Sequence, residues 1–258
     1  MRLWQVDAFT AEPFAGNPAA VCLLDGPRDD RWMQQVAAEM NLSETAFLLP
    51  EGEAYRLRWF TPTTEVDLCG HATLASAHVL FGKEGGPGGI TFRTRSGELR
   101  ASRRGDAIEI DFPSLPPTGD PPPPGLLEAL GVPKPRSTHR SRFDRLVELD
   151  SEEAVRAVAP DFRALREVDT RGVIVTARGK RHDFVSRFFA PAAGVDEDPV
   201  TGSAHCVLAP FWAARLDRKE MTGFQASRRG GEVRVRLAGD RVFLGGRAVT
   251  VLEGELRA

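Results

Sequence analysis

Residues 58–72 read RWFTPTTEVDLCGHA, and residues 187–204 read RFFAPAAGVDEDPVTGSA. Both stretches contain an Arg-x-Phe-x-Pro pattern and a later Val-Asp pair, and each of these positions recurs 129 residues further along. Gly70 and Ala72 recur as Gly202 and Ala204, so the second copy contains three additional residues. Such internal similarity predicts a chain made of two copies of one structural module.

The length of the chain agrees with two modules, because 258 residues suffice for two domains of ordinary size. The first module is expected over residues 1–113 and the second over residues 136–247. Residues 114–135 are rich in proline, which interrupts helices and central strands, so they are expected to form a linker. The last strand, about 248–258, could pack back onto the first module.

Two stretches with helical character occupy matching places in the modules, at 69–81 and at about 201–215. Both are apolar on nearly every side, which is typical of a helix enclosed by the rest of its domain. Pro210 is expected to kink the second of them or to mark a break in its register. A further helix is expected at 151–167. Short strand runs outnumber the helices and are too close together for helical crossovers. The expected fold is therefore α/β (α+β), with each central helix wrapped by a mostly antiparallel or mixed sheet.

The composition argues against several classes of function. The 34 basic residues are balanced by 36 acidic ones, which gives no general attraction for nucleic acid. No apolar run is long enough for a membrane span, and the first residues do not resemble a signal peptide. The three cysteines form no Cys-x-x-Cys pair, which favours a reducing, cytoplasmic setting over a disulfide-stabilised one.

Gly70 and Gly202 begin the two apolar helices. The start of a helix exposes unpaired N–H groups, and glycine lets a ligand approach that backbone closely. These two positions could therefore bind a small anion, most simply a carboxylate. The alternative is that both helix starts are ordinary caps, with Asp67 and Thr201 as the capping side chains.

Several longer motifs show that the chain resembles the PhzF family of phenazine-biosynthesis isomerases, within the diaminopimelate-epimerase-like fold. They are DAFTxxxxFAGNPAAV at 7–21, EMNLSETAF at 39–47, FTP at 60–62, GHATL at 70–74 and EDPVTGSA at 197–204. The resemblance covers nearly the whole chain. It implies a cofactor-independent enzyme, two similar domains with the active site between them, and a homodimer. It also implies a reaction that shifts a proton within a small, cyclic, amino acid-like carboxylate.

The same resemblance assigns roles to individual residues. Glu44 matches the catalytic acid/base, His71 the histidine of the Gly-His motif, and Asp198 the acid of the EDP(x)TGSA motif. The implied substrate-binding residues are Ser43, Gly70, Thr201, Gly202 and Ser203, with Asn17 of the Gly-Asn-Pro turn as a further candidate. Glu44 precedes an apolar run, which suits a carboxylate that removes and returns a proton at the edge of a cleft. Taken without the family, Glu44 reads as a solvated turn residue, His71 as a structural histidine and Asp198 as a cap before Pro199.

Cys69 is a secondary catalytic candidate. Diaminopimelate epimerase and proline racemase use two thiols, each placed before a glycine at a helix start. Here the first position is Cys69, but its counterpart is Thr201, which cannot form a thiolate. The start of a helix is expected to lower the pKa of the Cys69 thiol.

Three functions therefore remain under consideration. The leading one is a proton-transferring isomerase that uses Glu44. The second is an amino-acid epimerase or racemase that uses Cys69. The third is a non-catalytic protein that binds small molecules on the same fold. No GxGxxG motif, P-loop or HExxH motif is present, so neither a nucleotide cofactor nor a metal is expected.

Overall fold

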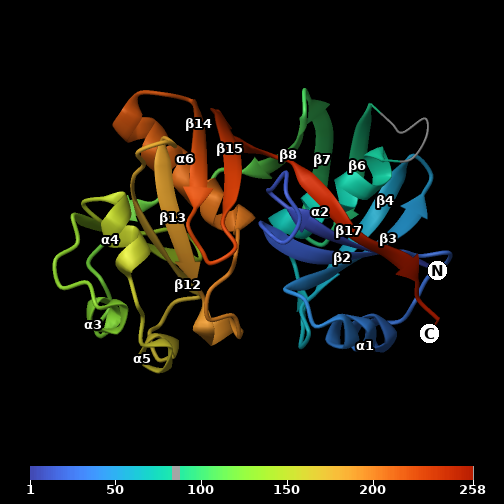
Figure 1. Ribbon diagram of the computed structural model, residues 1–258, viewed down its shortest axis with the longest axis horizontal. Coiled ribbons are helices and arrows are strands. Elements are labelled where there is room, and N and C mark those ends of the chain that lie inside the picture. Colours follow the sequence, from blue (N-terminus) through green and yellow to red (C-terminus); the bar gives the residue numbers. More distant parts are fainter. Residues whose placement is uncertain (83–87, 258) are drawn as a thin grey trace. The chain divides into compact units, whose positions relative to one another are not determined.

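The computed structural model describes residues 1–82 and 88–257, which form two compact units. Unit 1 comprises Met1–Phe112 together with Phe243–Ala258, and unit 2 comprises Pro113–Val242. The last strand, β17 (Ala248–Glu255), pairs with the first strand of the chain in unit 1. Each unit has its own group of paired strands and its own central helix (Figure 1).

The sheet of unit 1 is mixed. Its remaining strands are β1 (Arg2–Ala8), β2 (Asn17–Leu23), β3 (Glu44–Glu51), β4 (Ala54–Phe60), β5 (Glu65–Val66), β6 (Gly89–Thr94), β7 (Gly97–Arg104) and β8 (Ala107–Pro113). Strand β1 is antiparallel to β2, β2 parallel to β3, β3 antiparallel to β4, and β4 parallel to β6. The last strands, β6, β7 and β8, form an antiparallel meander.

Two helices pack against this sheet. Helix α1 (Asp30–Met40) begins at Asp29, whose carboxylate accepts a 2.7 Å hydrogen bond from the Trp32 N–H, and it contacts β3 and β4. Helix α2 (Gly70–Phe81) is buried at eleven of its twelve positions and contacts β1, β2, β3 and β17. Its sequence is apolar on all sides because it is enclosed, as expected.

Unit 2 repeats the same order of strand pairs. Its strands are β9 (Thr118–Gly119), β10 (Ser137–Arg140), β11 (Asp144–Glu148), β12 (Gly172–Arg178), β13 (Phe184–Phe189), β14 (Glu220–Gln225), β15 (Gly231–Ala238) and β16 (Arg241–Gly246), the last of which spans the boundary between the units. Strand β10 is antiparallel to β11, β11 parallel to β12, β12 antiparallel to β13, β13 parallel to β14, and β14 antiparallel to β15. The sequence repeat is therefore a repeat of topology as well.

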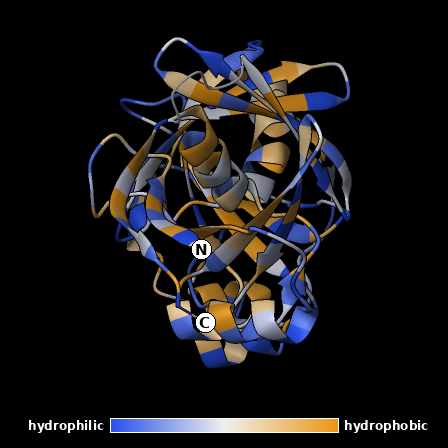
Figure 2. Cartoon of the chain, turned by 90° about the vertical axis from the view of Figure 1, so that its right-hand side faces the viewer, coloured by the Kyte–Doolittle hydropathy of each residue, from blue (hydrophilic) through white to orange (hydrophobic). Residues whose placement is uncertain are grey.

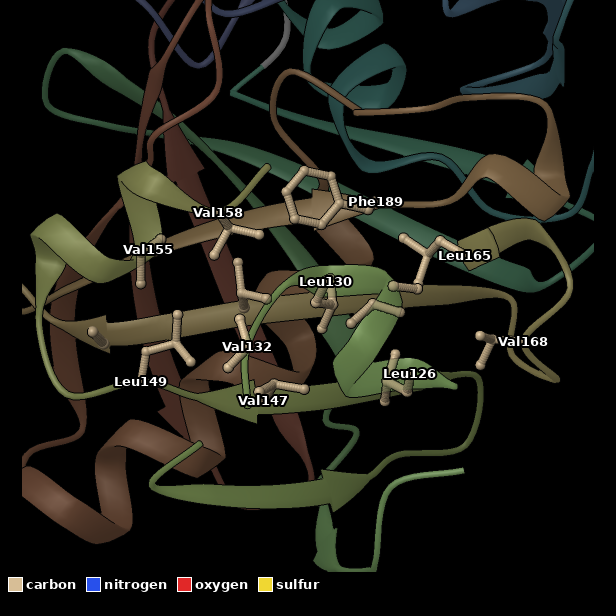
Figure 3. Close-up of a cluster of buried hydrophobic side chains, with 14 of the residues drawn as sticks. Leu126, Leu130, Val132, Val147, Leu149, Val155, Val158, Leu165, Val168 and Phe189 are labelled. Atoms are coloured by element: carbon tan, nitrogen blue, oxygen red, sulfur yellow. The ribbon is translucent and has the colours of Figure 1, made fainter. Parts of the chain in front are cut away.

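The proline-rich segment 114–135 belongs to unit 2 and is not a separate linker. Within it, α3 (Leu126–Leu130) buries Leu126 and Leu130 in the hydrophobic core of this unit, beside Val147 and Phe189 (Figure 3). The run of four consecutive prolines ends at residue 124, and the apolar stretch that follows it gains more free energy when buried than when exposed in a linker.

The helix expected at 151–167 is two short helices, α4 (Glu152–Ala157) and α5 (Phe162–Arg166). Pro160 lies between them, and proline disfavours helical backbone both at its own position and at the residue before it. Ser151 and Asp161 cap the two helices separately, each accepting a hydrogen bond from a backbone N–H.

Helix α6 (Gly202–Leu216) continues through Pro210 without interruption. Proline has no N–H, so the carbonyl of Cys206, four residues earlier, lacks its helical donor. The Leu115 N–H donates a 3.0 Å hydrogen bond to that carbonyl. This contact satisfies the orphaned carbonyl from outside the helix, and it also ties the segment after β8 to the central helix of unit 2.

Among the described residues, every helix is either too short or too polar to cross a lipid bilayer. Figure 2 shows hydrophobic and hydrophilic residues alternating along many of the strands. This alternation is typical of sheets with one face toward a core and one toward water.

Candidate functional site

Glu44 and His71 meet in unit 1. Glu44 is the first residue of β3, and His71 is the second residue of α2. Their Oε2 and Nε2 atoms lie 3.1 Å apart, with side-chain exposures of 18% for Glu44 and 4% for His71. Neither atom has a well-aligned hydrogen-bond partner among the described residues. Glu44 therefore contacts the imidazole of His71 and also has a side chain that is partly accessible to solvent.

Asn17 holds the other side of the imidazole. This fully buried residue begins β2, and its amide nitrogen lies 3.1 Å from His71 Nδ1. Gly16 before it has φ +64°, and a Cβ atom there would lie 2.2 Å from the Ala8 carbonyl oxygen. Only glycine fits that turn, so the Gly-Asn pair places the amide against the histidine.

Cys69 also contacts His71, with its Sγ atom 3.6 Å from Nδ1. Burial raises the pKa of the Cys69 thiol to about 11, and the nearby charge of Glu44 acts in the same direction. The expectation of a lowered pKa for Cys69 is therefore wrong: the loss of solvent outweighs the helix start. Cys69 is a neutral thiol at neutral pH.

The pKa of His71 is raised. Burial disfavours the imidazolium, but the charges of Cys69 and Glu44 outweigh it and move the pKa of His71 well above its usual range. Because Cys69 remains a thiol at neutral pH, Glu44 is the anion that favours a proton on His71 there. The Glu44–His71 pair is thus suited to hold a proton and to release it.

Glu44, Cys69 and His71 also offer three potential metal ligands whose atoms lie within 4.8 Å of one another. A carboxylate, a thiol and an imidazole are ligands that zinc accepts. However, Cys69 lies beside Nδ1 and Glu44 beside Nε2, on opposite edges of the ring. One ion bound to a single ring nitrogen would require one of these side chains to move. The arrangement fits a chain of proton-carrying groups better than a tetrahedral metal site.

In unit 2, the loop before α6 is tied by its own polar side chains. The Thr201 hydroxyl donates a 2.5 Å hydrogen bond to Asp198 Oδ2. Neither α2 nor α6 has a side-chain cap, so the interpretation of Asp67 and Thr201 as caps is wrong. Gly202 begins α6, as Gly70 begins α2, and both glycines are buried.

Gln225 is a site-supporting residue that no motif identified. It ends β14 and is fully buried. Its Oε1 accepts from the Thr201 N–H at 2.9 Å, and its Nε2 donates to the Asp198 carbonyl at 2.7 Å and to the Thr201 hydroxyl at 3.2 Å. The available signal was its position beside Phe224, which repeats Phe92 of the first module.

Ser203, in the first turn of α6, accepts a 3.1 Å hydrogen bond from Arg171 Nη2. The remaining sequence candidate, Ser43, lies directly before β3 and is half-buried, next to Glu44 in the chain. The structure thus groups Glu44, His71, Cys69 and Asn17 in unit 1, and it groups Asp198, Thr201 and Ser203 around α6 in unit 2.

Comparison with known proteins gives the same family as the sequence motifs. The model of the phenazine biosynthesis-like protein family (PhzC-PhzF) matches residues 6–254. An uncharacterized isomerase of Halalkalibacterium halodurans is 55% identical, over 98% of this chain and 97% of the relative. One of Pseudomonas aeruginosa is 56% identical, over 100% of this chain and 98% of the relative.

Solved structures show the same relationship. A PhzF-family phenazine biosynthesis protein of Enterococcus faecalis has a TM-score of 0.95 and 43% identity, covering 100% of this chain and 99% of the other. A probable proline racemase of Agrobacterium radiobacter shares the fold alone, with a TM-score of 0.66 and 12% identity over 99% of this chain and 92% of the other. The chain belongs to the phenazine biosynthesis-like (PhzF) family of isomerases.

Proposed function

We propose that this protein is a cofactor-independent isomerase that moves a proton within a small, amino acid-like carboxylate by general acid–base catalysis. Glu44 takes the proton from one carbon of the substrate and returns it to another. The C–H bond that breaks leaves its electron pair in the substrate, where the double bond shifts, and no oxidant or reductant is consumed.

The contact between Glu44 and His71 is the observation that carries this proposal. The two groups lie 3.1 Å apart, and the Glu44 side chain is the more exposed of the two, at 18% against 4% for His71. A base must reach its substrate, whereas the group that supports it can stay buried. Negative charge at Glu44 favours a proton on His71, so the histidine can store or stabilise charge while the carboxylate changes state.

The substrate class follows from the donors around α6. Gly202 and Ser203 combine a hydroxyl group with the first N–H groups of a helix that lacks a side-chain cap, whereas the Thr201 hydroxyl already donates to Asp198. Such a set favours an anion, and a carboxylate is the simplest anion of an amino acid-like molecule. We propose Asp198 as a second polar group of the reaction, held by the Thr201 hydroxyl.

Glu44→Gln tests the proposal. The amide has the same shape but cannot accept a proton from carbon, so we expect turnover to fall at least about 100-fold. The protein would be incubated in heavy water with dihydro-hydroxyanthranilate and with a panel of small amino acids, and deuterium uptake would be read by mass spectrometry. Exchange that persists in Glu44→Gln at the wild-type rate would contradict the role of Glu44.

Cys69→Ala separates this proposal from an epimerase or racemase that uses the thiol. A thiol with a pKa of about 11 supplies little thiolate at neutral pH, so we expect Cys69→Ala to retain exchange within about tenfold of the wild type. Loss of exchange in Cys69→Ala alone would favour the thiol mechanism. Saturable binding without exchange for any compound would favour a binding protein.

The homodimer and the cytoplasmic location expected from the sequence remain predictions. Light scattering on the purified protein measures the first, and fractionation of the source cells measures the second.

A further inference from the structure

Strand pairing aligns the two modules residue by residue. Phe60 and Phe189 are equivalent in the sequence repeat, and they pair with Thr45 and Val173 on the neighbouring strands. The preceding residues are therefore equivalent as well: Glu44 corresponds to Gly172, and Ser43 corresponds to Arg171. The parallel neighbours agree, because Glu44 pairs with Ala19 and Gly172 pairs with Asp144.

Unit 2 has no room for a carboxylate at the position of Glu44. A Cβ atom on Gly172 would lie 2.3 Å from the ring of Phe188. The adjacent residue supplies the functional group instead. Arg171 Nε donates to Asp144 Oδ1 at 2.8 Å, and Nη2 donates to Oδ2 at 2.5 Å.

The contact with the helix start is also repeated, with different chemistry. His71 follows the first glycine of α2, and Ser203 follows the first glycine of α6. Glu44 lies 3.1 Å from His71, and Arg171 Nη2 lies 3.1 Å from Ser203 Oγ. Where unit 1 has an acid–base pair, unit 2 has a cation beside a hydroxyl.

This cation is held in place and keeps donors available. The Asp144 side chain is fully buried, whereas the Arg171 side chain is 41% exposed. The rings of Phe143 and Phe188 lie 5.3 and 5.9 Å from the guanidinium carbon. Among the described residues, Nη1 donates no hydrogen bond to a side chain or carbonyl. Ser203 accepts from Arg171, so its own proton is free to be donated.

We propose that Arg171 is a specificity-determining residue that binds the carboxylate of the substrate together with Ser203. The inference rests on the proposed function and deepens it. Asp144 offsets much of the guanidinium charge, which suits a singly charged carboxylate better than a phosphate. The buried carboxylate fixes the orientation of Arg171, and orientation is what hydrogen bonding to a planar anion requires.

The test compares an acid with its amide. The wild type, Arg171→Met and Ser203→Ala would be titrated by calorimetry with 3-hydroxyanthranilate and with 3-hydroxyanthranilamide. We expect the wild type to prefer the acid by about ten- to a hundredfold, as for a hydrogen bond to a charged group. Arg171→Met should lose that preference, and Ser203→Ala should reduce it. Arg163→Met, which changes an exposed arginine of α5, should keep it.

Arg171→Met alone leaves the buried Asp144 without its partner and could unfold the protein. The double variant Arg171→Met/Asp144→Asn removes both charges, and thermal melting would identify the variants that fold. An acid preference that survives in the folded double variant would overturn the inference, as would equal or undetectable binding of acid and amide by the wild type. Failure of the proposed function can be told apart from failure of this inference. In that case deuterium exchange would be absent while the Arg171-dependent preference for the acid is present.

Discussion

At the scale of single residues, two buried histidines show how the surroundings decide a chemical role. His71 and His205 both lie in the first turns of the central helices, with exposures of 3% and 0%. Burial disfavours a proton on His71, but the negative charge of Glu44 favours one, and the pKa of His71 lies well above its usual range. Burial lowers the pKa of His205 to about 4, and the hydrogen bond between its ring and the Thr201 carbonyl opposes that shift only in part. His71 therefore favours the protonated form at neutral pH, whereas His205 is a neutral structural residue.

This difference predicts an acid-sensitive contribution to stability from His205. Its folded-state pKa of about 4 lies below the unfolded value near 6.5, so the unfolded chain binds the proton first. Stability from His205 is complete above pH of about 6.5 and is lost as the pH falls toward about 4, by at most about 1.4 kcal/mol per pH unit.

His205→Asn isolates the effect, because its amide nitrogen can still donate to the Thr201 carbonyl in place of Nδ1. We expect urea unfolding to show that the wild type loses about 2 kcal/mol more than the variant between about pH 7 and about pH 5. Other titrating groups, His71 included, cancel in this difference. An equal loss in both proteins would show that His205 is not held neutral.

At the scale of elements, the loop that enters α6 depends on a strand from elsewhere in the sheet. Three bonds from Gln225 of β14 hold Asp198 and Thr201, and the Ser227 hydroxyl donates a 2.8 Å hydrogen bond to the Pro199 carbonyl. The three additional residues of the second module lie in this loop. Hydrogen bonds from Gln225 and Ser227 thus hold the longer loop.

Gln225→Met is expected to loosen this loop. The thioether has nearly the same size, but the Thr201 N–H and the Asp198 carbonyl lose their partners. We expect unfolding to be easier by about 1–3 kcal/mol, because the buried Thr201 N–H loses its acceptor. Turnover should fall with it, because Asp198 and Thr201 move. Ser227→Ala removes a single bond to the same loop and serves as the control. A Gln225→Met protein as stable and active as Ser227→Ala would contradict the supporting role of the amide.

The local sequence predicted those elements whose pattern is strong. The apolar run of α2 predicted a buried helix, because no side of it can face water. The prediction of a single helix at 151–167 was wrong at Pro160. It relied on the helical spacing of apolar residues and gave too little weight to the backbone restriction that proline imposes. Strands β10 and β14 have no clear strand pattern in the sequence, since STHR and EMTGFQ are short and partly polar. Their pairing partners lie far away in the chain, and only those partners make them strands.

The same limit applies to the site. Glu44, His71 and Cys69 occur in motifs, and the structure brings them together. Gln225 and Arg171 lie in no motif, and their importance depends on contacts with residues 24 and 32 positions away. Local sequence cannot encode the sign of the pKa shift of Cys69 either, because that shift follows from complete enclosure by the fold.

At the scale of the whole molecule, the two units do not follow each other simply along the chain, because unit 1 is built from two separate segments. The chain leaves unit 1 after Phe112 and returns to it at Phe243. Strand β17 then pairs along the full length of β1, from Arg2 with Glu255 to Ala8 with Ala248. Unit 1 therefore depends on the last residues of the protein, whereas unit 2 is continuous in sequence.

A protein that ends at Arg247 should lose the structure of unit 1 selectively. Deleting β17 would expose β1, whose Leu3, Trp4 and Val6 are buried. It would also remove contacts with α2, including the 3.0 Å hydrogen bond between His78 Nε2 and Thr250 Oγ1. An apolar strand with an unpaired edge also promotes aggregation. Hydrogen exchange read by mass spectrometry should show lower protection in β1 and α2, by about 3 kcal/mol or more from the lost pairing, while β11, β12 and β13 keep theirs. A protein that ends at Leu256 keeps β17 and serves as the control. Equal loss of protection in both units would show that the two units unfold as one.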